Sequence, residues 1–247
     1  MSMANVRVLP DAASVAATAA ELFVASATKA LAERDRWTCA LSGGSTPRAT
    51  YELLARPPLV DRVNWRAVHL FWGDERHVPP DDPDSNYRMV FEALLKHVPI
   101  PADHVHRVPA ELPSAADAAA AYEDTLRTIF KLGPGDLPRL DFVLLGMGPD
   151  GHTASLFPGT PALSEQHALV VANPVAKLHT DRITLTLPVL NNAREIVFLV
   201  TGQEKAATLA AVLQGERQPD ELPSQLIQPV DGSLTWLVDT AAAAQIG

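Results

Sequence analysis

The chain has 247 residues, of which 47% are hydrophobic, and 29 Asp and Glu residues outnumber 20 Lys and Arg residues, giving a formal charge of -9. The hydrophobic fraction excludes a mainly disordered chain, and the acidic balance argues against a general nucleic-acid binder, which needs a positive surface. The single cysteine, Cys39, excludes an intrachain disulfide and a thiolate zinc site. The sequence has no apolar run of membrane-spanning length and no signal-peptide pattern. We therefore expect a cytoplasmic protein, a monomer or small homo-oligomer, that contacts neither membranes nor nucleic acid.

Segments with helical and strand-like patterns alternate along the chain. Helices are expected over residues 11–34, with Asp11 as N-cap, and over residues 47–55, 86–97, 114–132 and 204–213. Apolar runs predict strands at residues 37–41, 68–72, 140–145, 169–172, 182–187, 195–200 and 234–238. This alternation is typical of an α/β fold with an open, mostly parallel sheet and helices on both faces. Because no repeat or low-complexity linker interrupts it, we expect one domain over residues 1–247.

Ligands of such sheets bind beyond the carboxyl ends of the strands, where this sequence has glycine-bearing loops. These loops span residues 42–47, 73–78 and 146–152. In the first loop, Gly43 and Gly44 allow backbone N–H groups to approach an anion, and Ser45 and Thr46 add hydroxyl donors. A helix capped by Ser45 or Thr46 then begins near Pro47. The loop suits a phosphate monoester, and an ordinary capped turn explains it equally well.

The second loop places consecutive ionisable residues, among them Asp74, Glu75 and Arg76, directly after a buried strand. Asp74 or Glu75 could position a sugar hydroxyl, and Arg76 could bind a phosphate through two guanidinium nitrogens. A solvated loop is the alternative, and the segment taken alone favours it.

The third loop contains a G-x-G-x-x-G pattern, as dinucleotide sites do. However, Asp150 would put a carboxylate inside the pyrophosphate cradle and Pro149 removes a backbone donor, so the sequence argues against NAD. Instead, the turn can present Asp150 and His152 at the mouth of the sheet. A neutral histidine can take a proton from water, and a nearby carboxylate would orient it. The setting favours a functional role for His152 over a structural one.

The remaining histidines and the cysteine are expected to be structural. His104 and His106 could share one strand face as metal ligands, but no third ligand is apparent, so no metal site is expected. His69 and Cys39 lie within apolar strands and are assigned to the core.

Two cationic residues lie where loops meet regular elements. Arg182 begins a predicted strand, and Lys205 follows the segment Thr201-Gly202-Gln203. Either could add positive charge to a shared anion site, although each taken alone is more typical of a surface charge.

Taken together in this order, the motifs resemble the 6-phosphogluconolactonase family and its wider relatives, the glucosamine-6-phosphate deaminases. The matching segments are LSGGSTP (41–47), FWGDERHVP (71–79), SNYRM (85–89), LLGMGPDGHTASLFPG (144–159), RITLTLP (182–188) and VTGQEKA (200–206). The resemblance implies a sheet of the sugar-phosphate isomerase type. It also implies hydrolysis of 6-phospho-D-glucono-1,5-lactone to 6-phospho-D-gluconate, the second step of the oxidative pentose phosphate pathway, without cofactor or metal.

The resemblance further implies roles for individual residues. The family's catalytic histidine falls on His152, and its acidic site positions fall on Asp74 and Asp150. The implied phosphate site consists of Gly43, Gly44, Ser45, Thr46, Arg76, Arg182 and Lys205. In the expected mechanism, His152 removes a proton from water, the water attacks C1 of the lactone, and the proton then goes to the ring oxygen.

One residue decides between the two enzymatic branches. Deaminases resemble D-G-H-I-A-F-N-E-P-G in this segment, with a glutamate that partners the histidine in opening the sugar ring. Phe157 stands at that position here. A phenyl ring cannot form a carboxylate–imidazole pair, and a lactone does not need one, because its carbonyl is already electrophilic. The lactonase branch is therefore favoured.

Two other functions are weighed against it. An aminosugar-phosphate deaminase or isomerase is the enzymatic alternative. A sugar-phosphate sensor of the kind found in transcriptional regulators would keep the phosphate loop and add a helix-turn-helix, for which the segment before Trp37 offers no room. The Asp150-Gly151-His152 segment favours catalysis over sensing.

Overall fold

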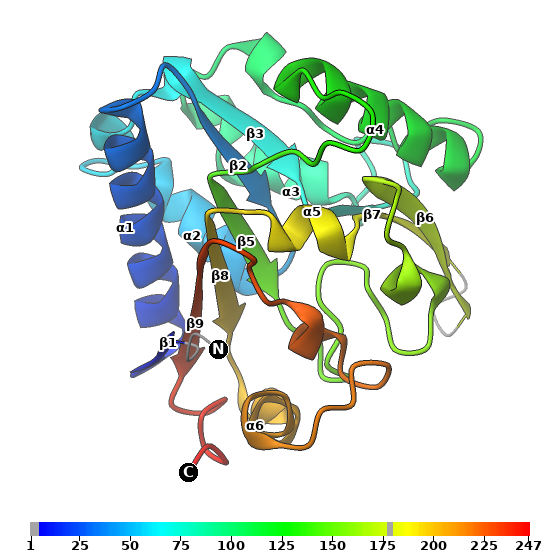
Figure 1. The fold of residues 1–247 in the computed structure, drawn as a ribbon. Helices are drawn as coiled ribbons and strands as arrows, with labels where there is room; N and C mark the ends of the chain where they lie inside the picture. The colour runs from blue at the N-terminus through cyan, green and yellow to red at the C-terminus, as the bar shows by residue number, and fades with distance from the viewer. Residues whose placement is uncertain (1–4, 177–179) are drawn as a thin grey trace.

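The computed structural model describes residues 5–176 and 180–247, and the strands in these ranges form two sheets (Figure 1). The larger sheet is parallel throughout and has the order β1-β9-β8-β5-β2-β3. Its strands are β1 (Asn5–Leu9), β2 (Trp37–Leu41), β3 (Val68–Trp72), β5 (Phe142–Gly146), β8 (Glu195–Val200) and β9 (Ser233–Asp239). The smaller sheet is antiparallel and contains β4 (Asp74–Arg76), β7 (Thr180–Leu185) and β6 (Val170–Val175), in that order.

The helices cover both faces of the parallel sheet. They are α1 (Ala12–Leu31), α2 (Ser45–Leu54), α3 (Asn86–Ala93), α4 (Ala115–Phe130), α5 (Leu187–Asn191) and α6 (Ala206–Gln214). With the right-handed crossovers usual between parallel strands, this strand order places α1 and α2 on one face of the sheet and α6 on the other (Figure 1). Helix α4 packs against β6 and β7 of the smaller sheet. The expected α/β fold with a mostly parallel sheet is confirmed.

The second sheet is the main difference from the sequence prediction. The strands expected at 169–172 and 182–187 are present, but they pair antiparallel with each other outside the parallel sheet. The expected loop at 73–78 instead contains β4, which pairs with β7. Strand β1 was not predicted, because its residues are mostly exposed and form no apolar run. For β1 and β4, long-range pairing with another strand, and not the local pattern, makes the segment a strand.

The N-termini of helices α1 and α2 compare differently with the sequence prediction. The side chain of Asp11 accepts a hydrogen bond from Ser14 N (2.7 Å), as expected of an N-cap. Helix α2, in contrast, begins at Ser45 and its N-cap is Gly44, so the prediction of Ser45 or Thr46 as cap was wrong. Gly44 has a φ of 105°, a conformation that glycine adopts readily and other residues rarely do.

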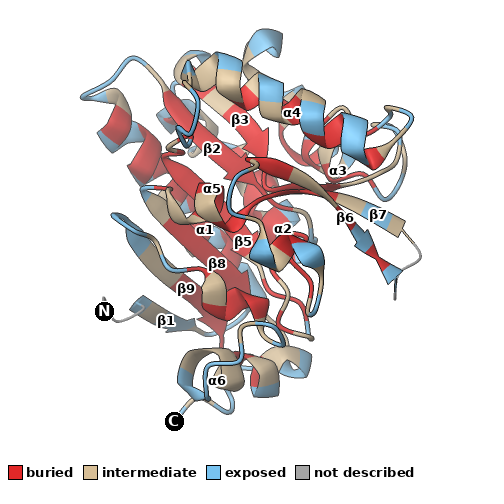
Figure 2. Ribbon diagram, turned by 45° about the vertical axis from the view of Figure 1, so that its right-hand side comes forward, coloured by how far each residue is buried: buried red, intermediate tan, exposed pale blue. Residues whose placement is uncertain are grey.

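Aromatic and aliphatic side chains fill the space around the parallel sheet, whose central strands are buried along their length (Figure 2). The ring of Phe23 in α1 packs edge-on against Trp37, with 4.6 Å between centroids, and also contacts Phe142. On neighbouring strands, the rings of Phe198 and Trp236 stack 3.8 Å apart. Cys39 is fully buried in β2, in agreement with its expected packing role.

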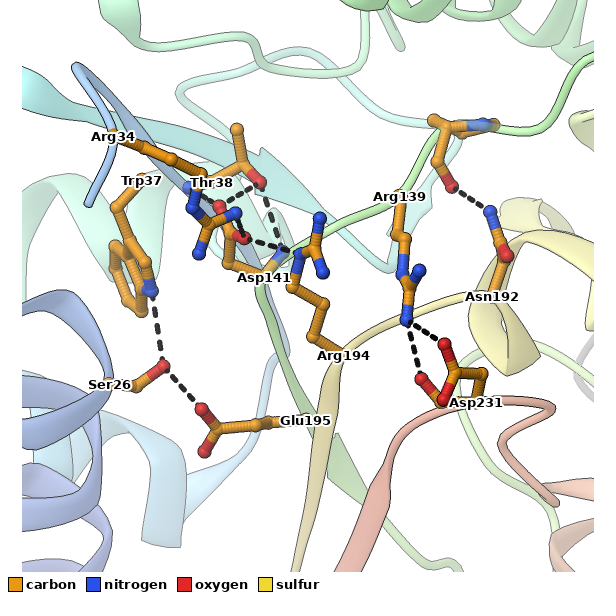
Figure 3. Close-up of polar contacts among 11 residues, drawn as sticks. Ser26, Arg34, Trp37, Thr38, Arg139, Asp141, Asn192, Arg194, Glu195 and Asp231 are labelled. Carbon is orange, nitrogen blue, oxygen red and sulfur yellow. Dashed lines mark hydrogen bonds and ion pairs between the residues drawn. The ribbon is translucent and has the colours of Figure 1, made fainter. Parts of the chain in front are cut away.

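A buried carboxylate joins the amino ends of three strands (Figure 3). Oδ2 of Asp141 accepts hydrogen bonds from the backbone N and the Oγ1 of Thr38, both at 2.9 Å. Oδ1 of the same carboxylate pairs with Arg34 and with Arg194 Nε (3.2 Å). These contacts connect β2, β5 and β8 at the end of the sheet opposite the glycine loops.

Within the described residues, no helix is long and apolar enough to cross a membrane.

Candidate active site

The loops after β2, β5 and β8, together with β4 and β7, line an open cavity of about 650 Å³. It lies at the carboxyl ends of the parallel strands, where ligands of such sheets bind. All ten residues singled out from the sequence line it, namely Gly43, Gly44, Ser45, Thr46, Asp74, Arg76, Asp150, His152, Arg182 and Lys205. The fold therefore brings together residues from five separate segments.

The glycine loop forms one wall of the cavity. The first helical hydrogen bond at this end of α2 runs from Arg48 N to Gly44 O (3.0 Å), so the N–H groups of Ser45 and Thr46 precede the helical ladder. Such N–H groups and the helix dipole favour an anion. An alanine at Gly43 would force the buried Asn86 side chain to move, because its Cβ would lie 2.0 Å from the Asn86 side-chain oxygen.

The third loop presents a histidine and an aspartate side by side. The Nδ1 of His152 lies 2.5 Å from Oδ1 of Asp150, and each side chain is more than one quarter exposed. With Nδ1–H donated to the carboxylate, Nε2 of the ring is the acceptor for water. Gly148 leaves room for the imidazole, because a Cβ at that position would lie 2.1 Å from it. The arrangement matches that of a histidine base oriented by a carboxylate.

Phe157 packs on the same histidine. The rings of His152 and Phe157 are stacked with centroids 4.2 Å apart, and Phe157 is buried. The position that distinguishes the two enzymatic branches is therefore in direct contact with the imidazole. A carboxylate at this position would give the ring a second acidic neighbour, whereas the phenyl ring supplies an apolar support.

The side chains of β4 alternate between the cavity and the body of the protein. Asp74 and Arg76 line the cavity, whereas the carboxylate of Glu75 caps helix α3. It accepts hydrogen bonds from Asn86 N (2.7 Å) and Tyr87 N (2.8 Å), and burial raises the pKa of Glu75. Of the two carboxylates that could serve a sugar hydroxyl, the structure thus assigns Glu75 to the helix cap.

Two arginines from the smaller sheet face the cavity together. Arg76 and Arg182 are direct partners in the β4–β7 ladder. Burial and the neighbouring Arg76 lower the pKa of Arg182, while Asp74 acts in the opposite direction. In the described part of the chain, Arg76 Nε is buried without a hydrogen-bond partner. A half-buried pair of like charges with one buried, unused N–H donor is a favourable place for a ligand anion.

Lys205 supplies a third cation. It ends a short 3-10 helix, Gln203–Lys205, after β8. Burial lowers the pKa of Lys205, and the carboxylates of Glu204 and Asp239 raise it. Its position at the cavity makes it a candidate phosphate contact, as the resemblance implied.

The histidines outside the cavity form a cluster at the edge of the parallel sheet. His69 Nδ1 lies 3.0 Å from His106 Nε2, and the His69 and His104 rings stack 3.9 Å apart. His69 is partly exposed, so its assignment to the core was only partly right. Across residues 5–176 and 180–247, no group of three or more potential ligands could hold a metal.

Several cavity residues were not selected from the sequence. Ser42, Asn86 and Ser155 line the cavity. Asn86 and Ser155 lie inside segments that carried the resemblance, SNYRM and LLGMGPDGHTASLFPG, so the motifs contained a signal for them. Their contacts depend on pairing between distant segments, which local patterns do not reveal.

Comparison with known proteins assigns the chain to a family. A family model described as glucosamine-6-phosphate isomerases/6-phosphogluconolactonase matches residues 10–236. The chain belongs to this family. A Nostoc protein named 6-phosphogluconolactonase is 44% identical over 98% of both chains. A Mycobacterium tuberculosis protein of the same name is 39% identical, again over 98% of both.

Solved structures within the family have the same fold. The 6-phosphogluconolactonase from Trypanosoma cruzi aligns with a TM-score of 0.86 and 31% identity, covering 98% of this chain and 96% of the other. A monomeric glucosamine-6-phosphate deaminase aligns with a TM-score of 0.80 at 20% identity, covering 98% and 99% of the two chains, which shows the shared fold alone. The Nostoc, Mycobacterium tuberculosis and Trypanosoma cruzi proteins, all above 30% identity, carry the lactonase name.

Proposed function

We propose that this chain hydrolyses 6-phospho-D-glucono-1,5-lactone to 6-phospho-D-gluconate in the pentose phosphate pathway. The observation that carries the proposal is the His152–Asp150 pair, supported by Phe157, in a cavity that also contains the glycine loop and three cationic side chains. The two chains at about 40% identity that carry the lactonase name support it.

In the proposed mechanism, the cationic side chains and the N–H groups of residues 43–46 bind the phosphate. His152 Nε2 takes a proton from water while Asp150 orients the ring through Nδ1. The oxygen of that water bonds to C1, the bond between C1 and the ring oxygen breaks, and the imidazolium gives the proton to the departing ring oxygen. General base catalysis of this kind is typically worth about 10² to 10⁴ in rate. No step requires a metal or cofactor.

We further propose that residues 1–247 act as one domain, because both sheets contribute to the cavity. The cytoplasm is the proposed location. Rice relatives at 40% identity carry the word chloroplastic in their names, so family membership alone does not determine the compartment.

The test uses 6-phosphogluconolactone generated from glucose 6-phosphate immediately before the assay. We expect the protein to form 6-phosphogluconate well above the spontaneous rate and to release no ammonia from glucosamine 6-phosphate. A rate equal to the spontaneous one would overturn the proposal, and ammonia release would restore the deaminase alternative.

A further inference from the structure

Ser155 is a buried hydroxyl in the cavity wall, three residues after His152, and the proposed mechanism does not use it. It is only 1% exposed. Its Oγ donates a hydrogen bond to Oδ2 of Asp74, at 2.6 Å. Asp74 is itself 8% exposed and lines the same cavity. The third loop and β4 are thus joined inside the site by a short bond between a hydroxyl and a carboxylate.

The position of Ser155 is set from both sides by the smaller sheet. Its backbone N donates to Thr184 Oγ1 in β7 (3.3 Å), and its carbonyl oxygen accepts from Asn173 Nδ2 in β6 (2.8 Å). Each strand of the sheet therefore contributes one buried polar side chain to Ser155, with Asp74 from β4 as the third. These buried hydrogen bonds to its backbone N and O and to its Oγ leave the Ser155 hydroxyl little freedom.

Asp74 also lies close to the arginine pair. The Asp74 carboxylate favours the charged form of Arg182. In the β4–β7 ladder Asp74 is opposite Thr184, and Arg76 lies two residues further along β4. Yet none of the ion pairs found among residues 5–176 and 180–247 joins Asp74 to either arginine. A carboxylate that turned onto the guanidinium groups would compete directly with a ligand phosphate, because both are bound by the same donors.

We infer that Ser155 is a positioning residue, whose hydroxyl holds Asp74 away from the Arg76–Arg182 pair and so keeps the pair available to the phosphate of the substrate. The inference rests on the proposed function, since it takes the arginine pair as a phosphate contact. It assigns Ser155 a role in binding the anion and none in the chemical step. No serine nucleophile is involved.

The test measures binding of inorganic phosphate and of 6-phosphogluconate to the purified protein by calorimetry, alongside kcat and KM for the lactone. Ser155→Ala is expected to weaken phosphate binding and raise KM by about tenfold, the scale of a hydrogen bond to a charged group, while kcat changes by less than about threefold. Ser155→Cys keeps the side-chain volume but has a weaker donor. It should also weaken phosphate binding and raise KM. It serves as the second variant if the alanine protein folds poorly.

Two further variants separate positioning from a merely structural role. In Asp74→Asn there is no carboxylate to compete for the arginines, so adding Ser155→Ala should cause little further loss of phosphate binding. Thr184→Val removes the bond to Ser155 N but leaves the Ser155–Asp74 bond, so it should lower Tm without a comparable loss of phosphate affinity.

The inference is overturned if Ser155→Ala binds phosphate with wild-type affinity. It is also overturned if Ser155→Ala lowers phosphate affinity equally in the wild-type and Asp74→Asn backgrounds, or if Thr184→Val lowers phosphate affinity as much as Ser155→Ala does. Wild-type protein that binds no phosphate overturns it as well. In that case hydrolysis of the lactone still decides the proposed reaction separately, because that assay does not depend on how the phosphate is bound.

Discussion

Arg76 and Arg182 are directly opposite each other in the antiparallel β4–β7 ladder, and both line the cavity. Like charges at opposite positions destabilise a sheet. Burial adds to the cost, as the lowered pKa of Arg182 shows. The arginine pair therefore lowers the stability of the unliganded protein, and a bound anion would relieve the repulsion. Such a pair is expected at an anion-binding site.

Arg182→Ala should therefore change the thermal stability of the protein and its affinity for phosphate in different directions. We expect the Tm of the unliganded variant to equal or exceed that of the wild type, because the repulsion is gone. Phosphate should raise the Tm of the wild type and have little effect on the variant, since a ligand stabilises only the state that binds it. KM for the lactone should rise by about 10- to 100-fold, the scale of a charge-assisted hydrogen bond. A variant that keeps wild-type KM and phosphate response would contradict this role for the pair.

Gly148 offers a test of how closely the imidazole must be placed. In Gly148→Ala, the new methyl group would lie 2.1 Å from the ring of His152, so the ring must move. We expect kcat to fall by about 10- to 100-fold, because small displacements of a catalytic group are costly. The matched control is Gly73→Ala, whose Cβ would meet its nearest neighbour, Leu41 O, at an ordinary 3.6 Å. Equal activity of the two variants would show that the ring position is not critical.

The histidine cluster predicts a pH dependence of stability that is independent of catalysis. Burial and neighbouring His104 lower the pKa of both His69 and His106 to about 4; for both, Arg36 acts in the same direction and Asp103 in the opposite one. Between this value and the usual one near 6.5, the unfolded chain binds more protons than the folded protein, so stability is lost as pH falls through that window.

Because His69 is only partly buried, its contribution is reduced by solvent, and we expect a loss of about 2 kcal/mol in the free energy of unfolding between pH 7 and 4. Urea unfolding at several pH values measures it. His106→Gln should flatten the dependence, whereas the exposed His167→Gln should leave it unchanged. A steep dependence that survives in His106→Gln would mean that other groups cause it.

The net charge of -9 predicts the response of activity to salt. An acidic protein repels a phosphorylated substrate at long range, and salt screens that repulsion. Raising the ionic strength from about 0.02 M to about 0.2 M should leave kcat/KM within about twofold or increase it. A steep decrease would instead show that the cations around the cavity dominate the field outside it.

The strands of the parallel sheet that consist of apolar runs could be predicted from the sequence. The apolar runs at 37–41, 68–72 and 195–200 coincide with β2, β3 and β8, because strands buried on both faces are apolar throughout. The site residues could be selected because the carboxyl ends of these strands converge on one cavity.

What the sequence could not show depends on contacts between distant segments. Asp74-Glu75-Arg76 is polar and becomes a strand only by pairing with β7. The separate roles of Asp74 and Glu75 follow from that pairing, since alternate side chains of a strand point in opposite directions. The Ser155–Asp74 bond joins residues 81 positions apart, and no local pattern indicates it.

The central claim is that His152 acts as the general base. It is tested most directly by the rate of hydrolysis of freshly generated 6-phosphogluconolactone, measured for the wild type and for His152→Ala under saturating substrate. We predict that kcat falls by about 10² to 10⁴ in the variant while it still binds 6-phosphogluconate. A His152→Ala protein that hydrolyses the lactone as fast as the wild type, above the spontaneous rate, would contradict the assignment.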